Sequence, residues 1–589
     1  MISRTTLAVS LTLFVSRSIA LAQPADAPVM PISELHAGQR GEVWTVFKGS
    51  EPEPFSVQVS GVIDNALGPG KNLILCELTD PRVQNMGAVA GMSGSPLYID
   101  GRIVGVLSYQ IQRFETVRYA GFTPISDMLE VSALPPAFSG PGGSALPIRG
   151  LRDGRGTKAS ADEFSPLSPA FAVSGLSPDV AAAFSSQFSA LGLGAVGLGG
   201  HADGTAGSTL TVTEDLKPGD VVAAALSVGD ISVAATGTVS HVEGNRILAF
   251  GHPMLSLGET ELPMIAAQVV TILPSQLNSI KVSNTGAVIG SFSQDRLSGI
   301  YGEIGRAPHL VPIDVELPSR LRHKTLHFAV VRHEQVLPVI AAAGLTQAVS
   351  GSNEAGFTHG FRLVTTVEFP GAEPFVMSQL YPGPQGFQQG VSDFVGRLQQ
   401  CLYNPYERTF PDHIRFSVEE TPEVPLGFIE NFQVSRAQAE PGANLTATVT
   451  WHGFQDREES ETVAFAVPPE WAGKELDVVL VPGPMLDEMT GRPRNPSATD
   501  YRNFDDFLAA QSQHRATDGL YLAVVEHTRL FSDQHALTPE MPASLERIAH
   551  RTDENRFQHR EAVAALWETN ILAGRVFNNQ FRKSLQVTE

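Results

Sequence analysis

Short runs of alternating hydrophobic and polar residues dominate the first 130 positions of the chain. Runs such as GEVWTVFKG, FSVQVSGVI, NLILCEL and RIVGVLSYQ are rich in valine, isoleucine and aromatic residues and are bounded by Gly, Asp or Pro. β-Branched and aromatic side chains fit a pleated, half-buried surface, and the bounding residues favour turns. The pattern over 32–134 therefore predicts an all-β barrel or sandwich, closed by a short helix at 125–131.

The β pattern returns twice farther along the chain. A stretch rich in Pro, Gly and Ser with a short helical patch precedes the second β-rich part, and a connecting segment with one helix follows it. A third β-rich part has the length and alternation of a small, immunoglobulin-like sandwich. The sequence after Asp500 is polar and predicts helices. The predicted divisions are a signal peptide at 1–22, β-rich halves at 32–134 and 205–370, a linker at 135–204, a connection at 371–427, a sandwich at 428–485 and a helical region at 486–589.

The N-terminus predicts export. Arg4 supplies the positive start, LAVSLTLFV the apolar core, and the small residues of ALA at 20–22 a cleavage site before Gln23. The apolar run is too short to span a bilayer, and no later segment reaches 18 unbroken apolar residues. We expect a periplasmic or extracellular protein without an integral membrane segment after signal removal, with retention at the cell surface left open.

Charge, cysteine content and motif spacing limit the partners, the disulfides and the cofactors that the chain is expected to have. The formal net charge of −21 argues against nucleic acid or an anionic membrane as the main partner. Cys76 and Cys401 are the two cysteines, and an exported chain leaves both a disulfide and two buried free thiols open. The spacing of His, Cys and carboxylates suggests no zinc site. A lone GxGxxG at 192–197 opens no clear helix, so we predict no cofactor.

Candidate chemistry concentrates in the stretch GMSGSP at 91–96. Gly91 and Gly94 permit a tight turn that would project the hydroxyl of Ser93, as nucleophilic serine chemistry requires. The backbone N–H groups of Gly91 and Ser93 are candidates for an oxyanion hole. The alternative is an ordinary β-turn in which glycine and serine serve only as turn residues.

This loop resembles the nucleophile loop of chymotrypsin-like serine peptidases. The resemblance is closer to the SpoIVB-type peptidases of bacteria, which carry Gly-Met-Ser-Gly-Ser-Pro preceded by a Thr-Asp-Pro-Arg segment, here LTDPRVQNMGAVAGMSGSP at 78–96. The family's histidine segment resembles ATGTVSHVEGNRILAFGHP, which places the histidine at His252. A glycine-rich segment that follows it in the family resembles GSFSQDRLSGIYGEIG.

The order of the two halves is reversed relative to that family, in which the histidine half comes first. A circular permutation accounts for the reversal, because triads are defined by geometry rather than by chain order. The resemblance implies a mainly β fold, with a chymotrypsin-like double β-barrel of permuted halves. The C-terminal sandwich-like domain and the helical tail follow it.

The resemblance implies a triad of Ser93 as nucleophile, His252 as general base and Asp80 as orienting carboxylate. Asp295 is the second candidate for the acid, and Glu259 also lies near His252 in sequence. Met92 stands where many chymotrypsin-like enzymes have an aspartate that pairs with a freshly cut N-terminus, so that activation switch is absent in that form. His252 has the alternative of a structural turn histidine, and Asp80 that of a turn-initiating residue.

Two other histidines compete with His252 for the role of base. His241 reads as the end of a strand, and His36, which precedes Ser93 as chymotrypsin order would require, lies in a polar turn and reads as solvated surface.

The resulting prediction is an exported serine endopeptidase that acts on a protein or peptide substrate, with narrow or self-cleaving specificity left open. The alternative is a catalytically silent cell-envelope binding or scaffold protein with a peptidase-like fold. An esterase using the same residues also stays open. The β-rich pattern argues against an α/β-hydrolase, whose nucleophile joins a strand to a helix.

Overall fold

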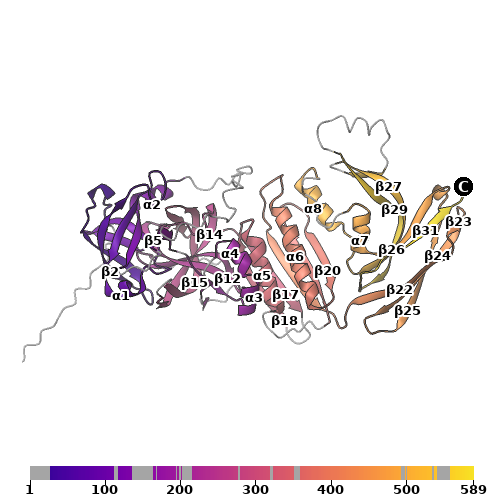
Figure 1. Ribbon diagram of the computed structural model, residues 1–589, viewed down its shortest axis with the longest axis horizontal. Helices are drawn as coiled ribbons and strands as arrows, with labels where there is room; N and C mark the ends of the chain where they lie inside the picture. The colour runs from indigo at the N-terminus through magenta and orange to yellow at the C-terminus, as the bar shows by residue number, and fades with distance from the viewer. Residues whose placement is uncertain are drawn as a thin grey trace, which may run out of the picture.

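The computed structural model describes most of the chain as an elongated series of β-rich units (Figure 1). The described residues are 27–111, 117–134, 164–167, 169–193, 196–197, 200–201, 215–275, 279–318, 323–350, 359–492, 498, 501–533, 536–539 and 557–589. The predicted signal peptide and most of the Pro/Gly/Ser-rich part of the predicted linker lie outside these residues. None of the helices that they form is long and apolar enough to cross a membrane.

The first β-rich half is a closed barrel, one of the two architectures, barrel or sandwich, that its alternating pattern predicted. Six strands pair in the ring β4-β1-β2-β3-β6-β5, which the pairing of β4 with β5 closes. Its strands are β1 (Arg40–Val46), β2 (Pro52–Ile63), β3 (Leu73–Leu78), β4 (Pro96–Ile99), β5 (Arg102–Ile111) and β6 (Tyr119–Pro124), with η1 (Ile32–Glu34), α1 (Pro81–Met86), the predicted closing helix α2 (Ile125–Ser132) and β7 (Phe164–Pro166), which pairs with β5. Inward side chains such as Val43, Phe55, Ile74 and Phe122 form its core.

The second β-rich half contains another closed six-stranded barrel. The ring runs β11-β14-β15-β16-β13-β12, and the pairing of β11 with β12 closes it. Its strands are β11 (Val221–Gly229), β12 (Ser232–Glu243), β13 (Arg246–Ala249), β14 (Gly258–Leu273), β15 (Ile280–Arg296) and β16 (Gly299–Ile304), joined by β8 (Ala170–Ser174), α3 (Pro178–Ala183), α4 (Ser185–Ala190), β9 (Val196–Gly197) and β10 (Gly200–His201). The pair of barrels agrees with the predicted chymotrypsin-like architecture.

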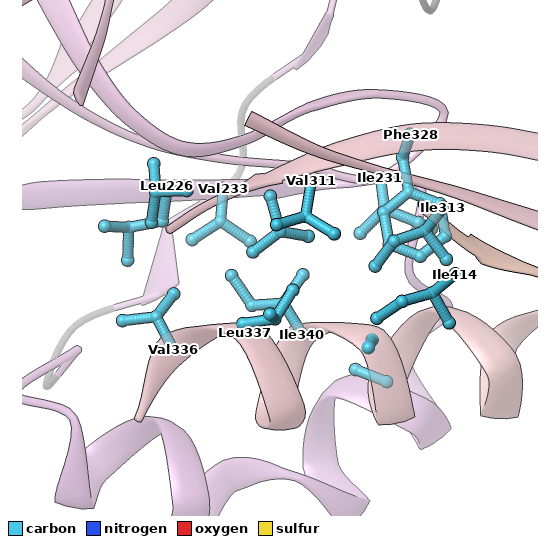
Figure 2. Close-up of a cluster of buried hydrophobic side chains, with 14 of the residues drawn as sticks. Leu226, Ile231, Val233, Val311, Ile313, Phe328, Val336, Leu337, Ile340 and Ile414 are labelled. Atoms are coloured by element: carbon cyan, nitrogen blue, oxygen red, sulfur yellow. The ribbon is translucent and has the colours of Figure 1, made fainter. Parts of the chain in front are cut away.

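An α/β extension continues the sheet of the second barrel. Strand β18 pairs with β11, and the sheet runs on through β17, β21, β19 and β20. The elements are β17 (Leu310–Pro318), β18 (His323–Val331), α5 (Val336–Ser350), β19 (Phe361–Glu368), β20 (Phe375–Tyr381), α6 (Gly383–Leu402) and β21 (His413–Glu420). Helix α5 is apolar, and Val336, Leu337 and Ile340 lie against side chains of the sheet such as Val311 and Leu226 (Figure 2). The extension thus shares one core with the second barrel.

The C-terminal part is a sandwich of two further sheets, β25-β24-β22-β30 and β23-β31-β26-β27-β28, with β29 paired to β27. Its elements are β22 (Leu426–Val434), β23 (Gln438–Ala439), β24 (Asn444–Gly453), β25 (Glu458–Ala466), η2 (Pro469–Trp471), β26 (Glu475–Pro482), α7 (Gly483–Met489), α8 (Phe504–Ser512), β27 (Gly519–Asp533), β28 (Ala536–Pro539), β29 (Phe557–Ala573), β30 (Val576–Phe577) and β31 (Phe581–Val587). Side chains of the two sheets, including Trp451, Val478 and Leu522, meet in one core.

The predicted helical tail at 486–589 is wrong for most of its described residues. Only α7 and α8 are substantial helices there, whereas β27, β29 and β31 complete the sandwich. Segments such as EAVAALWETNILA contain good helix formers, but long-range pairing of β29 with β27 overrides their local preference. Long-range strand pairing also changes two predicted boundaries. Strand β8, in the predicted linker, joins the second barrel, and β20, α6 and β21, in the predicted connection, build the extension.

Cys76 and Cys401 are both buried free thiols, and burial raises the pKa of each to about 12.

Candidate active site

The loop that carries Ser93 connects α1 of the first barrel to β4 and turns sharply at two glycines. Gly91 has φ +97° and Gly94 has φ +93°, a conformation that favours glycine. A Cβ at Gly94 would lie 2.2 Å from the carbonyl oxygen of Thr238 and 2.5 Å from the amide nitrogen of Phe250. The second glycine of the motif is therefore required by the close approach of the second barrel.

The hydroxyl of Ser93 is buried and has no hydrogen-bond partner among the described residues, although the side chain is completely enclosed. Its neighbour Ser95 differs, since its hydroxyl donates to the carbonyl of Met92 at 2.6 Å. Buried polar groups are normally paired, and an unpaired hydroxyl at this position is typical of a group kept for chemistry. Of the two buried serines in the turn, only Ser93 thus has an uncommitted oxygen.

In the loop that carries Ser93, some backbone N–H groups are hydrogen-bonded and others have no acceptor among the described residues. Those of Met92, Gly94 and Ser95 donate to the carbonyls of Val89, Leu107 and Met92, at 2.9, 2.8 and 3.0 Å. Within the described part of the chain, the N–H groups of Gly91 and Ser93 donate to no acceptor. These are the two donors that the sequence predicted for an oxyanion hole, and both are uncommitted.

His252 follows β13 on a backbone held in an uncommon conformation. Phe250 and Gly251 have φ +70° and +68°, and strained residues of this kind persist where the surroundings fix them. The Nδ1 atom of His252 lies 2.8 Å from the carbonyl oxygen of Pro253, which can only accept, so Nδ1 carries the hydrogen. Nε2 of the neutral ring is then an unprotonated acceptor, the form that a general base needs.

The interface between the barrels brings the two loops together. The amide of Thr238 on β12 donates to the carbonyl of Ser93 at 2.8 Å, and the amide of Phe250 donates to the carbonyl of Thr238 at 3.3 Å. The hydroxyl of Thr123 on β6 donates to the carbonyl of Gly251 at 2.7 Å. Ser93 and the residues before His252 therefore share one layer of hydrogen bonds. Ser93 Oγ and His252 Nε2 are not hydrogen-bonded to each other in this conformation.

Burial controls the protonation of His252. The ring is fully enclosed, and this burial lowers its pKa to about 4, while the contact with the carbonyl of Pro253 opposes the shift. Nε2 has no partner among the described residues. The imidazole is therefore neutral at neutral pH, with Nε2 unprotonated.

Asp80, the first candidate for the acid, caps α1. Its carboxylate accepts from the backbone N–H of Arg82 at 2.8 Å and pairs with the guanidinium of Arg82 at 3.0 Å. Burial raises the pKa of Asp80, but the hydrogen bonds and charge of Arg82 outweigh this and hold it below its usual value. These contacts fit an N-cap residue, and none of them joins Asp80 to His252.

Asp295, the second candidate, holds the loop that follows His252. Its two oxygens accept from the N–H groups of Met254, Leu255 and Leu257 at 2.7, 2.9 and 3.0 Å. The side chain is almost completely buried, and this burial raises its pKa, which the N–H groups partly offset. Asp295 thus acts on the backbone beyond His252 rather than on the imidazole.

Sequence reasoning missed two side chains that border the site. Thr123 fixes the carbonyl next to His252, and Lys281 on β15 packs against Gly91. Neither stands in a recognisable motif, so only the pairing of the barrels reveals them. Among the residues that the structure describes, no three His, Cys, Asp or Glu side chains are arranged to hold a metal ion.

Comparison with known proteins identifies one family. Residues 15–128 match the family SpoIVB peptidase S55. The match includes Ser93, Gly91 and Asp80 and ends before His252 and Asp295. No curated protein and no solved structure matches the chain.

Proposed function

We propose that this protein is an exported serine endopeptidase, because residues 15–128, which include Ser93, match the SpoIVB peptidase S55 family, a family of serine peptidases. Ser93 is its nucleophile and His252 its general base. The observation that carries the proposal is the convergence of an uncommitted Ser93 hydroxyl, two uncommitted N–H groups and an imidazole with a free Nε2 at one interface. The permuted order of the halves belongs to the same proposal.

In the proposed reaction, Ser93 Oγ attacks the carbonyl carbon of a peptide bond while its proton moves to His252 Nε2. The N–H groups of Gly91 and Ser93 hold the oxyanion of the tetrahedral intermediate. The intermediate collapses as the proton passes from Nε2 to the leaving amine, and an acyl-enzyme remains. Water, deprotonated by His252, then attacks the acyl carbonyl and releases Ser93.

Substrate access requires a movement, because both Ser93 and His252 are fully buried. Catalytic hydrogen bonds are often long in the absence of substrate and tighten when it binds. We therefore propose that substrate engages the interface between the barrels and draws Ser93 Oγ and His252 Nε2 into contact. A requirement of this kind fits narrow specificity, up to cleavage of a single partner or of the chain itself.

The two candidate acids are expected to respond differently to removal of the carboxylate. Asp295→Ala leaves one buried and two partly buried N–H groups without an acceptor, which costs about 3 kcal/mol of the free energy of unfolding and loosens the His252 loop. Asp80→Ala removes an N-cap, worth about 1 kcal/mol. The free energy of unfolding is measured by chemical denaturation, and the reactivity of Ser93 by its rate of fluorophosphonate labelling. We expect Asp295→Ala to lose more stability and more labelling rate than Asp80→Ala. A larger loss of labelling in Asp80→Ala would instead assign the acid to Asp80, as the family resemblance implies.

Peptide cleavage by the exported form, beginning at Gln23, tests the proposed function. New N-termini generated from a denatured protein mixture are identified by mass spectrometry for the parent, Ser93→Ala and Ser95→Ala. We expect cleavage by the parent and by Ser95→Ala, and a loss of at least about 10³-fold in Ser93→Ala. Ser95 is the matched control because it is equally buried in the same turn but its hydroxyl is committed to Met92.

The catalytically silent alternative predicts another result. A binding protein that retains the fold would give no new N-termini with any variant, and Ser93→Ala would leave its unfolding midpoint and its partner binding unchanged. The enclosed hydroxyl of Ser93 is the feature of the structure that favours this alternative.

A further inference from the structure

A lysine is buried at the interface between the two barrels. Lys281 lies near the start of β15, its side chain is 3% exposed, and its ammonium nitrogen donates to the hydroxyl of Thr45 on β1 at 2.9 Å. Lysine is almost never fully buried without a carboxylate partner. The proposed reaction gives this residue no role.

Lys281 contacts the nucleophile loop through its backbone and its side chain. Its amide donates to the carbonyl of Ala90 at 2.9 Å, and the amide of Ala90 donates to the carbonyl of Ser279 at 2.9 Å. A Cβ at Gly91 would lie 3.0 to 3.3 Å from three carbons of the Lys281 side chain, so the aliphatic stem covers the α-carbon of Gly91. Lys281 therefore fixes the residue that supplies one of the two candidate oxyanion donors.

No opposite charge faces the amine among the described residues. The loop from Gly87 to Ser95 has no titratable residue, and the cross-strand partner of Lys281 on β14 is Ile272. On β1 both Arg40 and Glu42 are exposed.

The remaining charges near this interface are directed elsewhere. Lys48, which follows β1, is exposed, and Glu53, the cross-strand partner of Thr45, pairs with Arg82. On β14, Glu259 and Glu261 lie at the opposite end of the strand, and on β15 Asp295 accepts backbone N–H groups at the far end. Within the described part of the chain, the amine of Lys281 is therefore held without a counter-ion.

We propose that Lys281 is a positioning residue for the nucleophile loop at 87–95. With an uncharged amine Lys281 holds the loop in place, and with a protonated amine it releases the loop. An ammonium at this site must be hydrated, and water can reach it only if β15 and the loop separate. Separation moves Gly91 and with it the candidate oxyanion hole. Catalytic competence then requires the neutral amine.

The pH range follows from the burial of the amine. Desolvation lowers the pKa of Lys281 from 10.5 to about 7 in the folded protein. Between these values the unfolded chain binds more protons than the folded one, so stability rises with pH from about 7 to about 10.5. Below about 7 the folded protein is protonated at Lys281 and the loop is released. Since the pKa of His252 is lowered to about 4, the acid limit of activity reflects Lys281 rather than the imidazole.

Lys281→Met tests the proposal because methionine keeps an unbranched stem over Gly91 but has no amine. Unfolding midpoints are measured from pH 6 to 10 for the parent, Lys281→Met and Lys217→Met, which alters an exposed lysine of the same half. We expect the midpoint of the parent and of Lys217→Met to rise with pH, and that of Lys281→Met to be higher at pH 7 and nearly constant. Equal pH dependence in the parent and Lys281→Met would overturn the proposal.

The catalytic consequence rests on the proposed function and is measured by fluorophosphonate labelling over the same pH range. At pH 6 about one tenth of the parent is neutral at Lys281, so Lys281→Met is expected to label about tenfold faster relative to its own plateau. Thr45→Val removes the acceptor of the amine and is expected to move the parent's half-maximal pH upward. A half-maximal pH unchanged in Lys281→Met contradicts the positioning role. If the parent is not labelled at any pH, the peptidase proposal fails, while the unfolding midpoints still decide the role of Lys281.

Discussion

Replacement of His252 with alanine is expected to lower the rate constant for fluorophosphonate labelling of Ser93 by at least about 10³-fold. The alanine removes the proposed base, and no described side chain that could replace it is hydrogen-bonded to the Ser93 hydroxyl. Among the described residues the ring of His252 makes one hydrogen bond, to the carbonyl of the adjacent Pro253, and chemical denaturation of His252→Ala separates the loss of labelling from any loss of stability. Stopped labelling reactions at pH 8, analysed by intact mass, give the rate.

His36→Ala is the matched control for this prediction. His36 precedes Ser93 in the chain, as the histidine of a chymotrypsin-ordered peptidase would, but it is exposed in a turn before β1. We expect the parent's labelling rate in His36→Ala. Loss of labelling in His36→Ala together with full labelling in His252→Ala would reject the permuted arrangement of the halves.

Gly94→Ala is expected to lower the free energy of unfolding by about 4 kcal/mol and to slow labelling at least about 100-fold. Both atoms that the new Cβ would meet, at 2.2 and 2.5 Å, belong to the backbone of the second barrel and cannot rotate away. The positive φ adds a further cost for a residue with a side chain. Because a shift of about 1 Å at a reacting group can cost about 100-fold in rate, the displaced loop loses activity beyond its loss of stability.

Gly101→Ala separates the two causes. Gly101 has φ +75° in the turn between β4 and β5, but a Cβ there would have nothing within 4 Å. This variant is expected to lose only about 1 kcal/mol and to keep the labelling rate. Similar losses in both variants, measured by chemical denaturation, would show that close approach of the barrels at Gly94 is not what requires glycine.

The sequence predicted the barrels well because their signal is local. Alternation of buried and exposed residues in β2 and the glycine turns at Gly94 and Gly101 are visible in the chain itself. Helix α2 was predicted within one residue of its end. The one helix of the connecting segment was expected at 391–403, whereas α6 begins earlier and spans Gly383–Leu402. Closure of each ring depends on pairing between strands that are distant in the chain. The local pattern predicts the number of strands but not which of them pair.

The C-terminal misassignment has the opposite cause. Strands β27 and β29 contain Ala, Leu and Glu, which suit a helix, and their pairing over a long register is invisible in either segment alone. The extension was underestimated for a related reason, since β17 pairs in parallel with β21, about 100 positions later. Local propensity decides such segments only when no distant partner competes for them.

Some residues of the candidate site are signalled by their local sequence, and others depend on contacts with distant parts of the chain. The motif around Ser93 and the glycine before His252 are local signals, and the structure places both loops at one interface. Asp80 could not be judged from sequence, because a Thr-Asp-Pro tripeptide serves equally as a helix cap, which is the contact it makes. The burial of Lys281 depends on residues more than 180 positions away and leaves no trace in its own segment.

The central claim is that the two barrels together activate Ser93, and the most direct test is to map a fluorophosphonate adduct on the parent chain. Peptide mass spectrometry after labelling at pH 8 is expected to find one modified residue, Ser93, and no adduct when His252 is alanine. An adduct on another serine, or none on the correctly folded parent, would contradict the account.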